Sequence, residues 1–351
     1  MSMKLSVLDL IPVRSGQTST DALHASRDLA LLADRLGYTR YWVAEHHNMT
    51  AIASTVPAVL IPYLAHGTER IRFGSGGVML ANHAPFAVAE QFALLASMYP
   101  DRIDLGLGRA PGSDQLTAAI LRQGLPGDGV ENYARDVELL RELLGEGATP
   151  LGADVPLSVA GRRYDIHATA APTSPVSIWL LGSSAHSAQL AAGMGLPYVF
   201  ANHFSIPGMA DVLALYRDNY VPSEQYPEPK TLLPVNAVVA PTDEEATRRA
   251  LAQTFTFARL RSGGKLEPAP SVETLEDYAW TAAELSVPRP AAPFTYVGTP
   301  GRVASDLRAL ANQMGADEVM ITPAAGHFEG EAPGTAPGRT QTLELLAQEL
   351  L

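Results

Sequence analysis

The stretch that decides the fold runs from residue 4 to residue 43 and reads KLSVLDLIPVRSGQTSTDALHASRDLALLADRLGYTRYWV. Its first apolar run, Lys4–Leu10, predicts a strand. Apolar residues recur at helical spacing through Thr20–Leu36, and Gly37 is a stop signal that predicts the end of this helix. Thr39–Val43 predicts the second strand. A strand, a helix and a second strand in this order predict two parallel strands joined by a helical crossover.

The same alternation continues to the end of the chain. Further strands are predicted at Arg70–Gly74, Ile103–Leu107, Ser177–Leu181, Tyr198–Ala201, Leu232–Val239 and Glu318–Ile321. Further helices are predicted at Ile52–His66, Phe86–Tyr99, Glu131–Leu144, Ala185–Gly193, Pro207–Tyr220, Thr242–Arg261, Thr299–Gly315 and Thr340–Leu351. Eight strands separated by helices in a chain of 351 residues predict one α/β domain, residues 1–351, folded as a closed (β/α)8 or TIM barrel. Two proline-rich segments predict insertions, Thr149–Pro175 after the fourth strand and Ser262–Val297 after the seventh.

Composition narrows the class of protein. Hydrophobic residues make up 46% of the chain, which is enough for a substantial core. The formal net charge of −12 argues against binding to a nucleic acid backbone. The chain has no cysteine, which excludes disulfides, thiolate metal sites and a cysteine nucleophile. It shows no signal peptide and no uncharged apolar run of membrane-spanning length, so we expect a soluble cytoplasmic protein without a membrane partner.

Chemistry in such a barrel belongs to the loops that follow the strands. The second strand is followed by Ala44-Glu45-His46-His47-Asn48, whose carboxylate and imidazoles are candidate acid/base groups. We expect no metal here, because a metal needs a third ligand and neighbouring histidines do not share one face. A histidine that only hydrogen-bonds its loop explains the pattern equally well.

Later strands are followed by glycine-rich or polar runs. These are Gly74–Leu80, Gly106–Gly112 around Arg109, Gly182-Ser183-Ser184 at the start of a helix, and Asn202-His203-Phe204. Glycines permit a close ligand approach, an arginine suits an anion or an electron-rich ring, and a helix N-terminus suits a phosphate. A tight turn, a loop-bracing arginine, a plain helix cap and an ordinary surface loop are the respective alternatives.

These loops together resemble the luciferase-like flavin monooxygenase family, and the resemblance extends over nearly the whole chain. It rests on Tyr41–His47, Ile71–Leu80, Asp101–Gly112, Gly182–Ser187, Gly195–Pro197 and Val297–Pro300. The forms of the glycine-rich runs are similar to those of uncharacterised bacterial members rather than of light-emitting luciferases.

The resemblance implies a role for individual residues. His46 matches the histidine that assists oxygen chemistry at the flavin, and Arg109 matches an arginine near the ring. Gly76 and Gly77 match a non-proline cis peptide beneath the ring. The loop that holds the FMN phosphate matches Gly182, Ser183, Ser184 and Ser187. The substrate pocket is expected to include His47, Asn202 and His203.

Three positions depart from the family pattern. Gly108 stands where the true luciferases carry a reactive cysteine, so no thiol can act there. Asn202 replaces a tryptophan beside the ring, which predicts a different pocket polarity. Arg289, within the second insertion, is the nearest candidate for a late phosphate-binding arginine.

The resemblance implies an FMN-dependent monooxygenase that uses molecular oxygen and reduced FMN, supplied by a separate reductase, to oxidise a small organic substrate. Two alternatives stay open. One is an oxidoreductase that transfers hydride with the deazaflavin F420, and the other is a non-catalytic flavin-binding protein. We also expect a homodimer formed through the helices Ile52–His66 and Phe86–Tyr99.

Overall fold

A computed structural model describes residues 3–110, 112, 114–122, 130–201, 208–286 and 295–351. Eight parallel strands close into a barrel, which confirms the predicted TIM barrel. Their bounds are β1 (Lys4–Asp9), β2 (Arg40–Val43), β3 (Arg72–Met79), β4 (Ile103–Gly108), β7 (Ser177–Gly182), β8 (Tyr198–Phe200), β9 (Thr231–Val239) and β11 (Glu318–Pro323). The strands follow one another around the barrel in chain order, and β11 pairs with β1 to close it.

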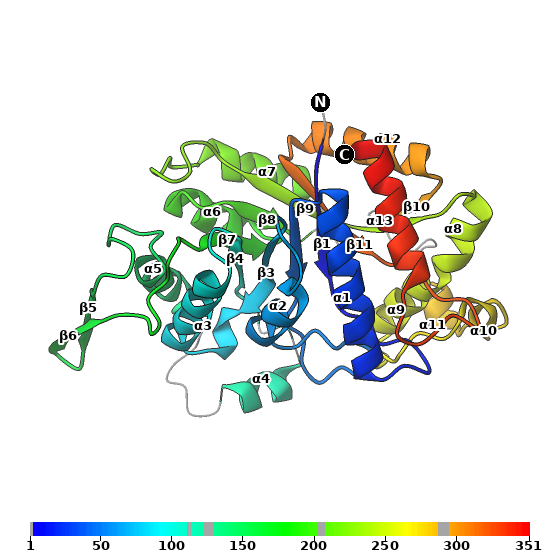
Figure 1. Cartoon of the computed structure of the whole chain (residues 1–351), viewed down its shortest axis with the longest axis horizontal. Helices are drawn as coiled ribbons and strands as arrows, with labels where there is room; N and C mark the ends of the chain where they lie inside the picture. Colours follow the sequence, from blue (N-terminus) through cyan, green and yellow to red (C-terminus); the bar gives the residue numbers. More distant parts are fainter. Residues whose placement is uncertain (1–2, 111, 113, 123–129, 202–207, 287–294) are drawn as a thin grey trace.

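Helices cover the outside of the barrel (Figure 1). Those of the first half are α1 (Ser19–Leu36), α2 (Pro57–Ala65), α3 (Pro85–Met98), α4 (Gln115–Leu121) and α5 (Tyr133–Leu143), with a short 3-10 turn η1 (Leu80–Asn82). Those of the second half include α6 (Ala185–Met194), α7 (Met209–Asp218), α12 (Pro300–Met314) and α13 (Pro337–Leu350). Local signals set their ends: Thr18 and Asp21 form a capping box before α1, and Gly37 ends that helix in the left-handed conformation.

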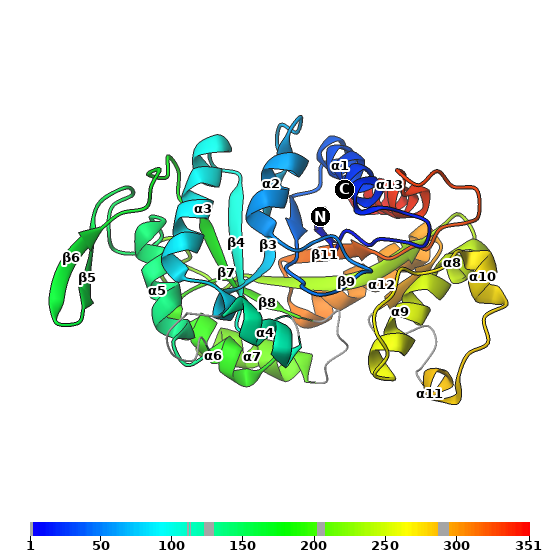
Figure 2. The ribbon, with the colours of Figure 1, turned by 90° about the horizontal axis from the view of Figure 1, so that it is seen from below.

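The segment 149–175 contains a β-hairpin that the sequence pattern did not reveal. Its antiparallel strands are β5 (Val155–Val159) and β6 (Arg162–Ile166), and it projects from the barrel (Figure 2). Ala160 and Gly161 form a two-residue turn, both with positive φ (49° and 75°). The glycine is the available signal for this turn, but Pro156 within the first strand weakened the strand pattern.

The second predicted insertion, residues 262–297, also contains regular structure, namely α10 (Val272–Glu276), α11 (Ala282–Leu285) and most of β10 (Thr295–Gly298). Between β9 and this insertion lie α8 (Asp243–Arg249) and α9 (Leu251–Arg261). The helix predicted at Thr242–Arg261 is therefore two helices. The carbonyl of Arg249 accepts a hydrogen bond from the backbone N–H of Gly326 at 2.8 Å. A distant loop therefore uses the acceptor that a continuous helix would need for its own hydrogen bond.

The barrel interior is apolar in its middle and charged at the N-terminal ends of the strands. Its middle is apolar and consists of Leu8, Trp42, Trp179, Val199, Leu232 and Met320. At the N-terminal ends of the strands, buried Arg40 lies 2.8 Å from both the Asp104 and the Glu318 carboxylates. These ion pairs fill the bottom of the barrel, so a ligand has room only at the opposite rim. No helix among the described residues is long and apolar enough to cross a membrane.

Candidate active site

Strand register brings the predicted site loops to one rim. In the paired strands Val43 lies opposite Ser75, Gly76 opposite Gly106, Gly108 opposite Leu181, and Gly182 opposite Phe200. The residues that follow these strand ends are therefore neighbours at the C-terminal face of the barrel, where the sequence analysis expected the site.

Glu45 joins the loops after β2 and β3. Its carboxylate is buried and accepts hydrogen bonds from His47 Nε2 at 2.9 Å, His83 Nε2 at 2.8 Å and the Met79 backbone N–H at 3.0 Å. Burial raises the pKa of Glu45, but the contacts with His83 and His47 outweigh it and leave the pKa below its ordinary value. Glu45 is thus an ionised anchor that holds the two loops together.

These contacts bear on the two explanations given for the histidines after β2, an acid/base group or a residue that hydrogen-bonds its loop. His47 is bound to Glu45, as the loop-bonding explanation requires, and its role at a substrate remains a prediction. His83 is a site residue that the sequence reasoning missed. Its signal was available, because it follows the third strand and so belongs to the same rim as the other candidates.

His46 differs from His47 in its surroundings. Its backbone N–H donates to the Ser54 carbonyl at 3.0 Å, and its imidazole Nδ1 is buried without a hydrogen-bond partner among the described residues. Burial, opposed by Glu45 and reinforced by His47, lowers the pKa of His46. The imidazole is therefore neutral at pH 7, and one buried nitrogen is free to bond a ligand.

Gly76 and Gly77 form the floor of the rim between β2 and β4. The peptide bond between them is cis, as the resemblance implies. A Cβ on Gly76 would lie 2.8 Å from Leu8 Cδ1, and one on Gly77 would lie 2.8 Å from the Gly106 carbonyl oxygen. A side chain at Gly77 would clash with backbone, and one at Gly76 would have to displace Leu8, so both positions favour glycine where the resemblance places the flavin ring.

The end of β4 shows what replaces the family's cysteine. A Cβ on Gly108 would lie 2.7 Å from the Met79 sulfur, so the methionine occupies the space that a side chain at 108 needs. The next residue, Arg109, is partly buried and makes no hydrogen bond or ion pair with the described residues. A guanidinium without a partner at this rim is available to an anionic ligand.

The end of β7 leads into the N-terminus of α6. Ser184 caps this helix and forms a reciprocal capping box with Ser187. A Cβ on Gly182 would overlap the Ser187 hydroxyl, which also lies 3.0 Å from the Tyr198 hydroxyl. The first turn of a helix leaves backbone N–H groups without intrahelical partners, so Ser183 and the following residues present an anion-binding geometry.

Three predicted positions have no structural account here. Asn202 and His203, expected in the substrate pocket, and Arg289, the candidate phosphate-binding arginine, all lie outside the described residues. The groups that the structure does bring to one rim are His46, the Gly76–Gly77 peptide, Arg109 and the Gly182–Ser187 segment.

The fold and this rim define a TIM-barrel enzyme whose site is built by the loops after its strands. The family model for luciferase-like monooxygenases matches residues 3–318, and the chain belongs to that family. A luciferase-like monooxygenase of Escherichia coli strain K12 is 39% identical over 320 residues, which cover 91% of each chain. The N-acetyl-S-alkylcysteine monooxygenase of Bacillus subtilis strain 168 is 36% identical over 291 residues, which cover 80% of this chain and 81% of that protein.

Solved structures share the architecture. The crystal structure of apo-MsnO8 is 33% identical with a TM-score of 0.81, covering 99% of this chain and 98% of that one. The oxygenating constituent of 3,6-diketocamphane monooxygenase from Pseudomonas putida, in complex with FMN, is 17% identical with a TM-score of 0.71, covering 100% and 98%. An F420-dependent secondary alcohol dehydrogenase is 15% identical with a TM-score of 0.64, covering 99% and 98%. The last two comparisons show the fold alone.

Proposed function

We propose that the chain is an FMN-dependent monooxygenase that takes reduced FMN from a separate reductase and, with molecular oxygen, oxidises a small organic substrate. Family membership supports monooxygenase chemistry. The observation that carries the proposal is the buried Nδ1 of His46, which has no hydrogen-bond partner among the described residues and belongs to the same rim as the Gly76–Gly77 cis peptide. A neutral imidazole placed in this way can hold or move one proton at a defined atom.

The residues present fit FMN. Gly76 and Gly77 have no Cβ, and Arg109, one residue beyond β4, has no ion-pair partner among the residues that the structure describes. Gly182 and the Ser183–Ser187 segment offer backbone N–H groups for the phosphate. Bound reduced FMN would supply the electrons and the ring at which oxygen reacts. The protein's own contribution is to position that ring, exclude water and keep His46 neutral.

Relatives support the same reaction class. The Bacillus subtilis relative is named as a monooxygenase of N-acetyl-S-alkylcysteine, a small organic sulfur compound. The Pseudomonas putida barrel, which shares only the fold, is an oxygenating constituent solved in complex with FMN and makes FMN one cofactor to test. A barrel of this fold also serves an F420-dependent dehydrogenase, so the cofactor must be tested directly.

One titration separates the three functions. FMN, reduced FMN and F420 are each added anaerobically to the purified protein, and binding is followed by flavin absorbance and fluorescence. We expect reduced FMN to bind, and oxygen to be consumed when air is admitted. Tight binding of F420 in place of FMN would refute the proposal in favour of hydride transfer. Tight binding of oxidised FMN without oxygen consumption would refute it in favour of a non-catalytic binder.

A substitution at His46 tests the carrying observation. His46→Ala removes the neutral imidazole and leaves the glycine floor and the α6 N-terminus in place. We expect turnover to fall by about 100-fold or more, as for loss of a positioned acid/base group, while FMN affinity changes little. His167→Ala, which removes an exposed imidazole on the other side of the molecule, is the control. Unchanged turnover in His46→Ala would rule out the assigned role.

The homodimer remains part of the proposal. Helices α2 and α3 expose the apolar side chains of Val59 (68%), Leu94 (45%) and Met98 (52%), and positions this exposed in a monomer would favour polar residues. A second copy is the occupant that we expect, through the same helices. Sedimentation equilibrium at micromolar concentration measures the mass, and a monomer would contradict this part of the proposal.

A further inference from the structure

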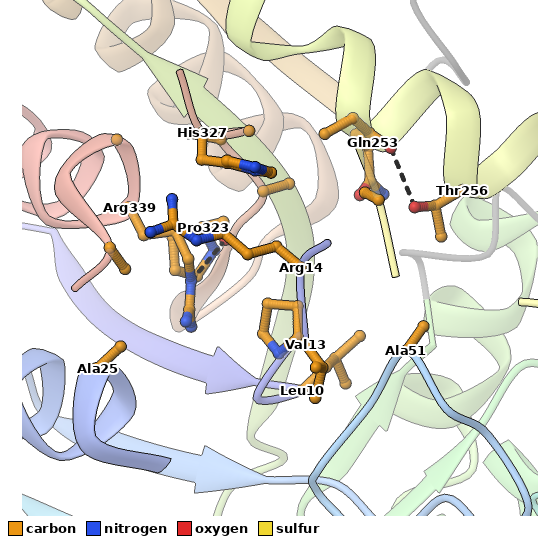
Figure 3. A pocket seen from close by; sticks show the side chains of 18 of the residues that line it. Leu10, Val13, Arg14, Ala25, Ala51, Gln253, Thr256, Pro323, His327 and Arg339 are labelled. Carbon is orange, nitrogen blue, oxygen red and sulfur yellow. Dashed lines mark hydrogen bonds between the residues drawn. The ribbon is translucent and has the colours of Figure 1, made fainter. Parts of the chain in front are cut away.

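A cavity opens on the rim above β1 and β11 and is not used by the residues described so far. Its volume is about 150 Å³, and its walls come from the loop after β1, helix α9, and the segment between β11 and α13. In the view of Figure 3, His327 and Gln253 lie on one side of the cavity and Leu10 and Val13 on the other. An apolar protein cavity of about 150 Å³ accommodates benzene, which sets the size of ligand that fits.

The lining of the cavity is mainly apolar. Leu8, Leu10, Val13, Ile52 and Leu266 contribute side chains to it, together with several alanines. Removing a ring-sized hydrocarbon from water into such a lining is favourable in proportion to the apolar area that becomes buried. The cavity therefore suits a molecule that is mostly hydrocarbon.

Every charged side chain of the lining already has a partner. Arg14 Nη1 lies 3.1 Å from the Glu331 carboxylate, and Arg339 is paired with Asp9. Glu267 also lines the cavity and is paired with an arginine of α9 at 3.4 Å. A charged ligand would have to break one of these pairs or remain uncompensated, and both are costly away from water. The ligand that fits is therefore neutral.

Thr322 and His327 contribute neutral polar groups to the lining that have no hydrogen-bond partner among the described residues. Thr322 is 8% exposed, and its hydroxyl is buried without a hydrogen bond. The His327 side chain, five residues later, makes no hydrogen bond with the described residues. Burial first, and then the nearby Arg14 guanidinium, lower the pKa of His327 to about 4, so this imidazole is neutral at pH 7. Buried polar groups without partners are the ones that a ligand is expected to satisfy.

The cavity reaches the floor of the proposed flavin site through one residue. Leu8 lines the cavity, and its Cδ1 is the atom that a Cβ on Gly76 would approach to 2.8 Å. A molecule in the cavity is thus separated from the Gly76–Gly77 peptide by a single leucine side chain. The cavity therefore borders the proposed flavin site at Leu8.

We propose that this cavity is the substrate site, and that it binds a neutral, ring-sized, mainly apolar molecule with one oxygen or nitrogen that hydrogen-bonds Thr322 and His327. The assignment as substrate rests on the proposed monooxygenase function. The binding itself does not, because the cavity exists without a flavin.

Three probes with one carbon skeleton test the binding. Benzyl alcohol is neutral with one hydroxyl, toluene lacks the polar group, and benzoate is an anion. Each is titrated calorimetrically into flavin-free protein. We expect one saturable site for benzyl alcohol, and at least tenfold weaker binding of benzoate. Benzoate binding as tightly as benzyl alcohol, or no saturable binding of benzyl alcohol, would overturn the proposal.

Two substitutions test the proposed hydrogen bonds between the ligand and the side chains of Thr322 and His327. Thr322→Val keeps the shape of the side chain and removes the hydroxyl, and His327→Phe keeps a ring and removes both nitrogens. Each is expected to weaken benzyl alcohol about 2- to 12-fold, the loss that corresponds to one neutral hydrogen bond, without weakening toluene. His167→Phe is the matched control. If neither Thr322→Val nor His327→Phe changes the preference for benzyl alcohol over toluene, the assigned contacts are wrong.

A variant whose side chain fills the cavity tests the location of the binding site in a second way. Ala269→Phe places a ring into the space and is expected to abolish binding of toluene and benzyl alcohol alike, with thermal melting as the check of folding. Undiminished binding to folded Ala269→Phe would place the ligand elsewhere and refute the proposal. Failure of the FMN titration with intact benzyl alcohol binding would instead overturn the monooxygenase function and leave the cavity site standing.

Discussion

Glu146 offers a test of the structure far from the active site. It follows α5 at the N-terminal side of the barrel and is 6% exposed. Its Oε1 accepts hydrogen bonds from the Ile178 backbone N–H at 2.9 Å and the Tyr226 hydroxyl at 2.8 Å, while Oε2 is buried without a partner. Burial outweighs these bonds and raises the pKa from its ordinary value of 4.5 to about 8.

The raised pKa fixes the sign of a stability change with pH. Below about pH 4.5 both the folded and the unfolded chain hold the proton, and above about pH 8 neither does. Between these values only the folded chain holds it, so stability falls as pH rises, by up to about 1.4 kcal/mol per pH unit. From pH 5 to pH 7 the loss from this single group is roughly 2–3 kcal/mol.

Glu146→Gln removes the titration and keeps the shape. The amide oxygen can accept both hydrogen bonds that Oε1 now accepts, and the amide group is neutral at every pH used. We therefore expect the stability of the variant relative to the wild type to rise by roughly 2–3 kcal/mol between pH 5 and pH 7, because only the wild type has a buried carboxyl that ionises. Groups that titrate identically in both proteins cancel in this difference.

Urea unfolding followed by tryptophan fluorescence at pH 5, 6, 7 and 8 measures the effect as a shift of the midpoint. Glu349→Gln, at an exposed position on α13, is the control and is expected to show no pH-dependent difference from the wild type. A difference between wild type and Glu146→Gln that stays constant from pH 5 to pH 8 would show that the carboxyl is not protonated in the fold. That result would refute the burial argument.

Two further changes test the barrel itself. Gly106→Ala places a Cβ onto the backbone carbonyl of Ser75, which cannot move aside, and should destabilise the fold by roughly 1–3 kcal/mol or more, whereas Gly301→Ala, with open space around it, should not. Arg40→Met leaves two buried carboxylates without their shared cation and should cost about 3–5 kcal/mol. Urea midpoints at pH 7 measure both effects. A wild-type midpoint for Gly106→Ala would contradict the packing argument, and a wild-type midpoint for Arg40→Met would contradict the importance of the ion pairs.

The barrel could be predicted from the sequence because its signals are local. Apolar runs, helical spacing and stop residues such as Gly37 repeat with each strand and helix, and eight repeats leave few other architectures. The β5–β6 hairpin was missed because its turn signal stands beside a proline in the strand. The break between α8 and α9 was missed because its cause is a hydrogen bond from Gly326, 77 residues away from Arg249.

The candidate site was predictable only in part, for the same reason. His46, Arg109 and the Gly182–Ser187 segment follow strands, so the topology alone assigns them to one rim. The pairing of Glu45 with His83 depends on two loops meeting, which no local pattern encodes. The cavity partners Thr322 and His327 belong to the last strand and its loop, where the sequence offered only an ordinary strand end.

Gly108 stands where the true luciferases carry a reactive cysteine, and this replacement changes the rim. Met79 and Gly108 lie opposite each other in the register of β3 and β4, and the methionine sulfur fills the space where a side chain at 108 would begin. A cysteine at 108 would therefore require the Met79 side chain to move aside or be smaller, so the two positions are coupled through packing. No thiol is present, and the neutral imidazole of His46 has a buried nitrogen without a partner among the described residues of this rim. We therefore assign the acid/base step of the proposed reaction to His46, and its substitution is the most direct test of the proposed function.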